Sequence, residues 1–280
     1  MKSIQLIAYL IFSGLLFFSC EKKENLADEK PSENLSTHVD IVSEKEMKYE
    51  SEGKNYNSYA YFKEDSNTLK PVVLVVPEWW GVNDYARSRA KQLADLGYFA
   101  VAVDFYGDGK VVDNPTDAQK LATPFYENPD LGKQAYNAAK SALSEFPNAD
   151  LSKMAIIGYC FGGAQALNMA RQDAGLKGAV SFHGSLMTGV KPNNNSVKIL
   201  VLNGEADNFV SAEEIAGFKS EMDSAKIDYK FINYPGAVHA FTNPQSTEVG
   251  KKFDMNIAYD KDADEKSWKE LENFLMEIFK

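Results

Sequence analysis

The segment that most constrains the fold of this chain is Met154 to Gly163, which reads Met-Ala-Ile-Ile-Gly-Tyr-Cys-Phe-Gly-Gly. An apolar run ends in Gly-x-Cys-x-Gly-Gly, and helix-forming residues follow from Ala164 to Arg171. This order predicts a strand, a very tight turn and a helix, with Cys160 at the apex of the turn. Such an arrangement is a nucleophile elbow.

Two glycines make so tight a turn feasible. Gly158 and Gly162 stand two residues before and two residues after Cys160, where the turn approaches neighbouring backbone and a Cβ would collide with it. The helix that follows points its positive end at the thiol and favours the thiolate. The alternative is a buried structural cysteine on a glycine-rich turn.

The overall composition limits the classes of protein that remain. Of the 280 residues, 44% are hydrophobic and 25% charged, as in ordinary globular proteins. The net charge of −10 argues against a nucleic acid partner, because phosphate binding needs a basic face. No metal-binding cluster and no nucleotide-binding loop stands out, so we expect neither a metal nor a cofactor.

The N-terminus is typical of a targeting signal. Lys2 precedes an apolar run from Ile4 to Phe18, which is short for a membrane-spanning helix and suitable for a signal peptide. The run ends at Ser19-Cys20 and resembles a bacterial lipoprotein signal, so we expect residues 1–19 to be removed and Cys20 to carry lipid. Cleavage by an ordinary signal peptidase and an uncleaved membrane anchor are the alternatives.

The rest of the chain divides into a tether and one domain. Residues 20–46 are polar without hydrophobic periodicity, which predicts a flexible tether. Residues 47–280 alternate between short apolar runs and amphipathic stretches, which predicts an α/β fold with a mostly parallel sheet and helices on both faces. Residues 106–130, rich in Gly and Pro, are expected to form an irregular excursion. The expected strands are 56–62, 71–76, 98–105, 154–159, 178–182, 197–202 and 229–234, and the expected helices are 84–96, 131–146, 164–171, 212–225 and 264–279.

A thiol nucleophile needs a base and an acid that orients the base. In α/β-hydrolases these follow the nucleophile in the order acid, then histidine. His239 comes directly after the last predicted strand, and Asp207 follows the strand before it. His183 comes too early in the chain, and His38 lies in the tether. The predicted triad is therefore Cys160, Asp207 and His239, with Glu205 as the nearest rival for the acid.

Backbone N–H groups would stabilise the oxyanion. The residue after the nucleophile, Phe161, supplies one of them. The other comes from the loop Pro-Glu-Trp-Trp-Gly after the strand at 71–76, where Trp79 is the preferred donor and Trp80 the alternative. Their indoles would form walls of the acyl pocket, although Trp80 is equally compatible with core packing.

Together these residues resemble the dienelactone hydrolase family, over nearly all of the chain after the tether. The resemblance rests on motifs at 77–83, 104–107, 158–163, 181–184 and 239–241, on Asp207 with Val210, and on Ala263-Asp-x-x-x-Ser-Trp268. It implies an α/β-hydrolase that cleaves lactones and activated esters through a Cys-His-Asp triad and an acyl-thioester. It also implies a role for Glu78, which would hold the resting thiol neutral and take part in its activation when substrate binds.

One departure bears on the substrate. The best-known family members bind the carboxylate of dienelactone with two arginines, whereas this chain has Gly-Asp-Gly-Lys110 and Thr-Asn243 at the matching places. We therefore expect a neutral ester or lactone as substrate. Aromatic residues near the site favour an apolar or aromatic acyl group, and the expected pocket contains Trp80, Phe105 and Phe241 beside Phe161 and Trp79.

The sequence thus predicts an exported hydrolase, lipid-anchored in the bacterial cell envelope, that acts on a small ester or lactone. We expect a monomer that meets the membrane only through its lipid. Two alternatives stay open: a non-catalytic substrate-binding lipoprotein on a hydrolase fold, and a thioesterase or cysteine peptidase.

Overall fold

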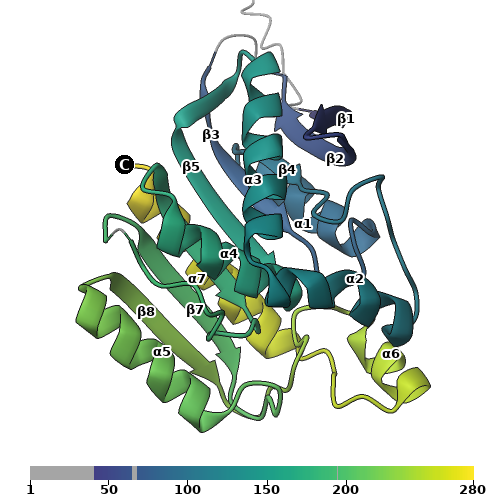
Figure 1. Ribbon diagram of the computed structural model, residues 1–280, viewed down its shortest axis with the longest axis vertical. Coiled ribbons are helices and arrows are strands. Elements are labelled where there is room, and N and C mark those ends of the chain that lie inside the picture. The colour runs from purple at the N-terminus through teal and green to yellow at the C-terminus, as the bar shows by residue number, and fades with distance from the viewer. Residues whose placement is uncertain (1–40, 65–67, 194) are drawn as a thin grey trace, which may run out of the picture. The chain divides into compact units, whose positions relative to one another are not determined.

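A computed structural model describes residues 41–64, 68–193 and 195–280 of the chain. Eight strands form one sheet in the order β1-β2-β4-β3-β5-β6-β7-β8 (Figure 1). β2 pairs antiparallel with both β1 and β4, and all the other neighbours are parallel. The strands are β1 (Val42–Ser51), β2 (Lys54–Lys63), β3 (Lys70–Val76), β4 (Phe99–Ala102), β5 (Ala149–Tyr159), β6 (Leu176–Phe182), β7 (Lys198–Gly204) and β8 (Asp228–Tyr234).

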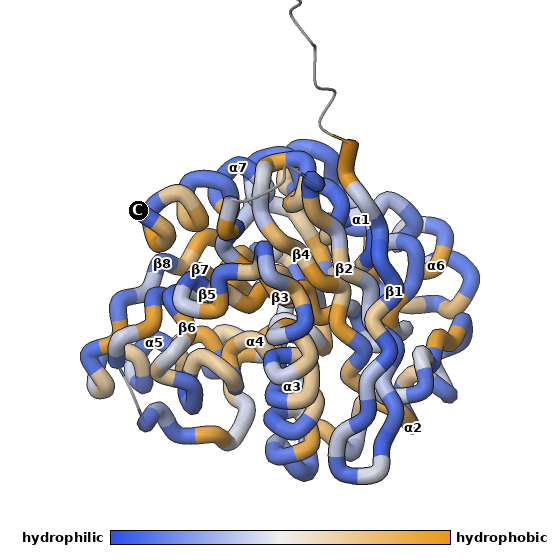
Figure 2. The backbone as a smooth tube through the Cα atoms, turned by 90° about the horizontal axis from the view of Figure 1, so that it is seen from above, coloured by the Kyte–Doolittle hydropathy of each residue, from blue (hydrophilic) through white to orange (hydrophobic). Residues whose placement is uncertain are grey.

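Helices cover both faces of the sheet, as the sequence predicts, and Figure 2 shows α3, α4 and α5 on one side of the strands and α1 and α7 on the other. The helices are α1 (Asp84–Asp95), α2 (Pro115–Glu127), α3 (Asp130–Ala142), α4 (Phe161–Gln172), α5 (Ala212–Ala225), α6 (Ser246–Phe253) and α7 (Lys261–Ile278), with a 3₁₀ turn at Leu143–Glu145. The fold is therefore that of an α/β-hydrolase, a doubly covered and mostly parallel sheet.

Strand β3 illustrates why the central strands are apolar throughout. Val72, Leu74 and Val76 face the core with α3 and α4, while Val73 and Val75 face the opposite core with α1 and α7. Because successive side chains of a strand point to opposite faces, a strand covered on both sides must be apolar at every position.

The domain begins earlier than the sequence suggests. The expected boundary at residue 47 lies inside β1, which starts at Val42. β1 is polar because it is the edge strand, and it is held by pairing with β2 along its whole length. The turn between them contains Glu52 and Gly53, both with positive φ, as a tight hairpin requires.

The expectation of an irregular excursion over 106–130 is wrong for its second half, because Pro115–Glu127 forms α2. The side chain of Asn114 accepts a hydrogen bond from the backbone of Asp117 and begins the helix. Pro115 occupies the first helical turn, where a missing N–H costs nothing. Pro124 is tolerated inside the helix, whose Phe125 is buried in the core.

Candidate active site

Cys160 lies at the apex of the turn between β5 and α4, with φ 53° and ψ −114°. This positive φ is uncommon for a residue with a side chain and marks local strain. A Cβ on Gly158 would lie 2.0 Å from the carbonyl oxygen of Gly162, and one on Gly162 would lie 2.2 Å from the carbonyl oxygen of Val76. Both glycines are therefore required by close backbone approach, and the nucleophile elbow that the sequence predicts is present.

The loops after β7 and β8 bring Asp207 and His239 together. The Nδ1 of His239 lies 2.8 Å from Oδ2 of Asp207, and the buried carboxylate also accepts the backbone N–H of Phe209 at 2.8 Å. A carboxylate held in this way fixes the ring with Nδ1–H toward Asp207, which leaves Nε2 for Cys160. Glu205 is exposed and does not pair with His239.

The pKa of His239 depends on the thiol of Cys160. Burial by itself lowers the pKa of His239, but Cys160 and Asp207 outweigh that effect and raise the pKa to about 10. His239 is flanked by the ring of Phe209, with centroids 4.8 Å apart, and by that of His183 at 5.1 Å.

His183 belongs to the buried layer behind the site. Its Nε2 lies 2.9 Å from Oγ1 of Thr242, which also pairs with the hydroxyl of Tyr85 at 2.7 Å. Burial lowers the pKa of His183 well below its usual value. A neutral histidine therefore packs against the proposed base from outside the cavity.

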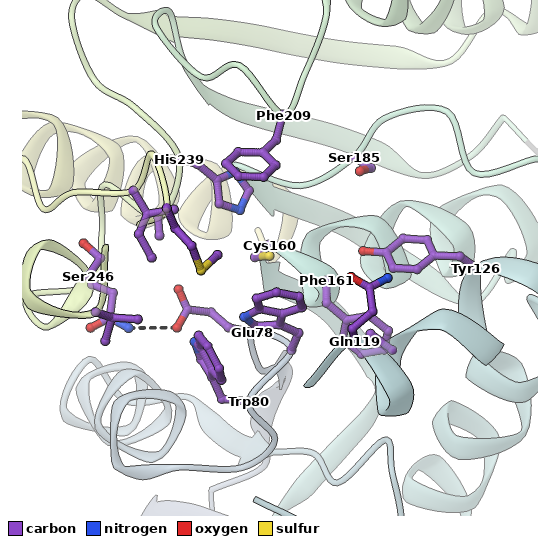
Figure 3. Close-up of a pocket in the computed structure, with 17 residues that line it drawn as sticks. Glu78, Trp80, Gln119, Tyr126, Cys160, Phe161, Ser185, Phe209, His239 and Ser246 are labelled. Atoms are coloured by element: carbon purple, nitrogen blue, oxygen red, sulfur yellow. Dashed lines mark hydrogen bonds between the residues drawn. The ribbon is translucent and has the colours of Figure 1, made fainter. Parts of the chain in front are cut away.

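Glu78 follows β3 and is almost fully buried in the same cavity as Cys160. Its Oε2 accepts a hydrogen bond of 2.8 Å from Nδ2 of Asn243. Burial raises the pKa of Glu78 to about 7, against the smaller opposing effects of Asn243 and His239. Figure 3 shows Glu78 and His239 on opposite sides of Cys160, so a carboxyl group and an imidazole flank the thiol.

Two backbone donors are available near the thiol. The N–H of Phe161 opens α4, where the first helical N–H groups have no intrahelical acceptor. In the described part of the chain, neither this N–H nor that of Trp79 donates to a protein acceptor. The hydroxyl of Tyr106 donates to the carbonyl of Trp79 at 3.0 Å and so fixes that loop.

A cavity of about 320 Å³ lies over Cys160 (Figure 3). Besides Glu78, Cys160 and His239 it is lined by Trp79, Trp80, Gln119, Ala122, Tyr126, Phe161, Ser185, Phe209, Ala240, Asn243, Ser246, Val249, Met255 and Ile257. These come from the strand-end loops, from α2 and from α6 with the residues that follow it.

Two expected pocket residues lie elsewhere. Phe105 is buried beneath the site, where its ring packs edge-on against Phe161. Phe241 is buried against His183 and Tyr234. Both support residues of the cavity from behind, whereas Trp80 lines it as expected.

The places expected to bind a substrate carboxylate carry no free cation. Asn243 lines the cavity as a neutral amide. Lys110 is half exposed, pairs with Asp108 at 3.4 Å and lies outside the lining. Among the described residues, no Lys or Arg lines the cavity and no cluster of side chains is suited to hold a metal ion.

The sequence did not indicate the contribution of α2 and α6. Gln119, Ala122 and Tyr126 come from α2, which was expected to be irregular, and Ser246 and Val249 come from α6, which was not anticipated. The helical cap Asn114-Pro115 was the available signal for α2.

The N-terminal expectations lie outside the described residues. The signal peptide, Cys20 and most of the tether fall within residues 1–40, about which the structure says nothing. Among the residues that are described, no helix combines the length and apolarity needed to cross a membrane.

Comparisons with known proteins agree with this architecture. The family model described as "Dienelactone hydrolase family" matches residues 57–279. Protein usf of Aquifex pyrophilus is 33% identical over 186 residues, which cover 64% of this chain and 80% of that protein.

Solved structures are similar as well. A dienelactone hydrolase-like promiscuous phosphotriesterase from metagenomic libraries aligns with a TM-score of 0.78 and 31% identity, over 85% of this chain and 99% of that one. An S-formylglutathione hydrolase from Agrobacterium tumefaciens aligns with a TM-score of 0.55 and 16% identity, over 70% of this chain and 88% of that one, and shares the fold alone.

Proposed function

This chain belongs to the dienelactone hydrolase family of carboxylic ester and lactone hydrolases, and from that premise we propose that it cleaves a neutral ester or lactone with Cys160 as nucleophile. The observation that carries the proposal is the hydrogen bond of 2.8 Å between Asp207 and His239, since His239 lines the cavity that also contains the strained Cys160. Nucleophile, base and orienting acid are the parts that acyl transfer requires.

In the first half of the reaction, His239 holds the proton of the thiol and the thiolate of Cys160 attacks the substrate carbonyl. A carbon–sulfur bond forms, and the negative charge on the carbonyl oxygen is stabilised by the N–H groups of Phe161 and Trp79. The intermediate then collapses, the carbon–oxygen bond to the leaving group breaks, and His239 gives its proton to the leaving alkoxide.

In the second half, His239 removes a proton from water, and the water oxygen attacks the acyl-thioester. The carbon–sulfur bond breaks, the carboxylic acid leaves and the proton returns to the Cys160–His239 pair. Asp207 keeps Nδ1 of the ring protonated throughout, so that Nε2 always faces the reaction. Glu78 lies beside the resting thiol in this scheme and helps to activate it when substrate displaces the carboxylate.

A neutral substrate follows from the charges in the cavity. Glu78 is the acidic lining residue, and no Lys or Arg among the described lining residues offsets it, while the charge of His239 is directed at Cys160 and Asp207. An anionic substrate would lose its hydration without gaining a Lys or Arg partner, which is costly in a buried site. We therefore propose that dienelactone, a carboxylate, is a poor substrate.

The decisive experiment compares the full-length chain with its Cys160→Ala variant on a panel of neutral lactones, aryl esters, thioesters and peptides. The panel includes a neutral phosphotriester because of the similar promiscuous phosphotriesterase. We expect lactone or activated ester hydrolysis that Cys160→Ala abolishes, and a mass increase of one acyl group on Cys160 after a slow substrate. Equal activity of both proteins would refute Cys160 as the nucleophile, and rates no faster than uncatalysed hydrolysis would favour a non-catalytic binding role. Preference for thioester or peptide would favour those rival activities.

The location of the enzyme is a separate proposal. We propose export and lipid attachment at Cys20, on the basis of the apolar run before Ser19-Cys20. Membrane fractionation and labelling with radioactive palmitate would test it against a Cys20→Ala variant. The unsubstituted chain should carry label in the membrane fraction, and an unlabelled chain would refute lipidation.

A further inference from the structure

The loop that carries His239 is strained directly after the imidazole. Ala240 has φ 57°, a left-handed conformation that is uncommon for a residue with a side chain. Such a conformation persists only where the surrounding structure holds the chain in place. The contacts that hold this loop therefore decide where the imidazole of His239 lies.

Thr242, three residues after His239, is fully buried and is held at three points by side chains from distant parts of the chain. Its Oγ1 lies 2.9 Å from Nε2 of His183, which follows β6, and 2.7 Å from the hydroxyl of Tyr85 on α1. Its carbonyl oxygen accepts a hydrogen bond of 2.7 Å from Nη2 of Arg89, also on α1. Thr242 thus joins the His239 loop to α1 and to the end of β6.

The hydrogen bonds at Oγ1 of Thr242 run in one direction. The guanidinium of Arg89 can only donate, and its Nε lies 3.4 Å from the hydroxyl oxygen of Tyr85. Among the described residues, Oγ1 of Thr242 is the acceptor within reach of the Tyr85 hydroxyl, so Tyr85 donates to Thr242. The hydroxyl of Thr242 then donates to Nε2 of His183, which assigns the ring proton of His183 to Nδ1.

His183 in turn contacts the imidazole of His239 directly. The two ring centroids are 5.1 Å apart, with the planes at 67°. The ring of Phe209 also packs against His239 at 4.8 Å (Figure 3), and Asp207 binds Nδ1. Three side chains therefore orient the imidazole, and of these His183 is the one that is bonded to Thr242.

We propose that Thr242 is a positioning residue for the base His239. It acts through the hydrogen bonds from Tyr85 to Thr242 and from Thr242 to His183, which we call the support chain. The support chain holds both the loop and the ring behind the base, and so keeps Nε2 of His239 directed at Cys160. This inference rests on the proposed function, because it takes His239 as the base for Cys160.

The physical basis is the precision that proton transfer requires. Both halves of the proposed reaction pass a proton through Nε2 of His239, so a shift of the ring slows whichever half limits the rate. A misplacement of about 1 Å costs on the order of 100-fold in rate. Thr242 does not line the cavity, so its loss should affect kcat and leave KM nearly unchanged. A residue that only supported the fold would lower stability and leave the rate of the folded enzyme as it was.

The test compares Thr242→Val with Thr242→Ser in the full-length chain, on the neutral ester or lactone that the unsubstituted enzyme cleaves fastest. Valine has a similar shape but no hydroxyl, which leaves Tyr85 and His183 without their partner. We expect Thr242→Val to lower kcat about tenfold to a hundredfold, with KM changed by less than about twofold. Thr242→Ser keeps the hydroxyl, and its kcat should stay within about threefold of the unsubstituted value.

Tyr49→Phe is the matched control for the loss of a tyrosine hydroxyl from a hydrogen bond inside the fold. The hydroxyl of Tyr49 on β1 pairs with Oγ of Ser58 at 2.8 Å, and neither residue lines the cavity. Tyr85→Phe removes the corresponding hydroxyl from the support chain and keeps the ring. It should lower kcat about threefold to tenfold, whereas Tyr49→Phe should leave kcat unchanged at a similar loss of stability.

A kcat of Thr242→Val equal to that of the unsubstituted enzyme would overturn the inference. The position of His239 would then depend on the backbone hydrogen bonds of its loop, such as the one from Ala258 to the carbonyl of His239. Equal losses in Thr242→Val and Thr242→Ser would overturn it as well, because the hydroxyl would then not matter.

If Thr242→Val does not fold, the comparison of Tyr85→Phe with Tyr49→Phe decides, and equal kcat values in these two variants would overturn the inference. Failure of the proposed function would look different, because Cys160→Ala would then be as active as the unsubstituted enzyme. Full kcat in Thr242→Val, together with loss of activity in Cys160→Ala, would overturn only the role of Thr242.

Discussion

Replacing Glu78 by Gln tests whether this buried carboxyl is kept for chemistry at the expense of stability. The amide has nearly the same shape, and its carbonyl oxygen can still accept the hydrogen bond from Asn243. The substitution therefore removes the titrating group, while it keeps the packing and the hydrogen bond from Asn243.

The magnitude follows from the pKa of Glu78, which burial raises from 4.5 to about 7. Below pH 4.5 the carboxyl is protonated in both the folded and the unfolded chain. Between pH 4.5 and 7 the folded chain holds the proton more tightly, so the free energy of unfolding falls as the pH rises through this range. The total loss corresponds to about 3 kcal/mol and is complete above pH 7.

The assay is urea denaturation of both proteins at half-unit steps from pH 4.5 to pH 8.5. Glu78→Gln should be about equal to the unsubstituted enzyme in stability near pH 4.5 and more stable by about 3 kcal/mol above pH 7.5. Glu205→Gln removes one carboxyl from an exposed position in a nearby loop and serves as the control. A stability difference that does not change with pH would refute the reasoning, since it would mean that the carboxyl ionises as easily in the fold as in the unfolded chain.

Three further predictions concern the orienting acid, the elbow and the support behind the site. Asp207→Asn should lower kcat about ten-thousandfold in steady-state assays, because the amide carries no negative charge and its NH2 group can donate to Nδ1 of His239, which puts the ring in the wrong tautomer. An unchanged kcat would refute the role of Asp207. Gly162→Ala places a methyl carbon 2.2 Å from the carbonyl oxygen of Val76, the last residue of β3. It should lower the free energy of unfolding by about 3 kcal/mol or more, measured by thermal denaturation. A melting temperature like that of the unsubstituted enzyme would contradict the close approach. Arg89→Met leaves the carboxylate of Asp264 buried without its charged partner. It should lower the free energy of unfolding by about 3–5 kcal/mol, measured by urea denaturation. The double variant with Asp264→Leu should recover most of that loss, and a double variant as unstable as the single one would assign the effect to lost packing.

The elbow and its immediate surroundings could be predicted from sequence because they depend on local sterics. Only glycine avoids the collisions on both sides of Cys160, and a continuous apolar run identifies a strand that is buried on both faces. The order of Asp207 and His239 after successive strands was informative for a related reason. Parallel strands deliver their carboxyl ends to one edge of the sheet, so residues distant in the chain meet there.

The walls of the cavity could not be predicted in the same way. Whether an aromatic side chain faces the substrate or the core depends on which helix packs over it, and Phe105 and Phe241 are covered although both lie near the site in sequence. The polar strand β1 likewise gave no hydrophobic signal, because backbone pairing with β2 holds it in place.

The sequence by itself determined which residues form the proposed reactive centre, since a strained turn and strand-end loops are dictated by local backbone geometry and by strand order. Only the tertiary structure decided what surrounds that centre. In that structure α2 and α6 lie over the edge of the sheet, Tyr126 and Val249 line the cavity, and Asn243 donates a hydrogen bond to Glu78. These contacts join segments far apart in the chain through burial and packing, which no local pattern of residues specifies.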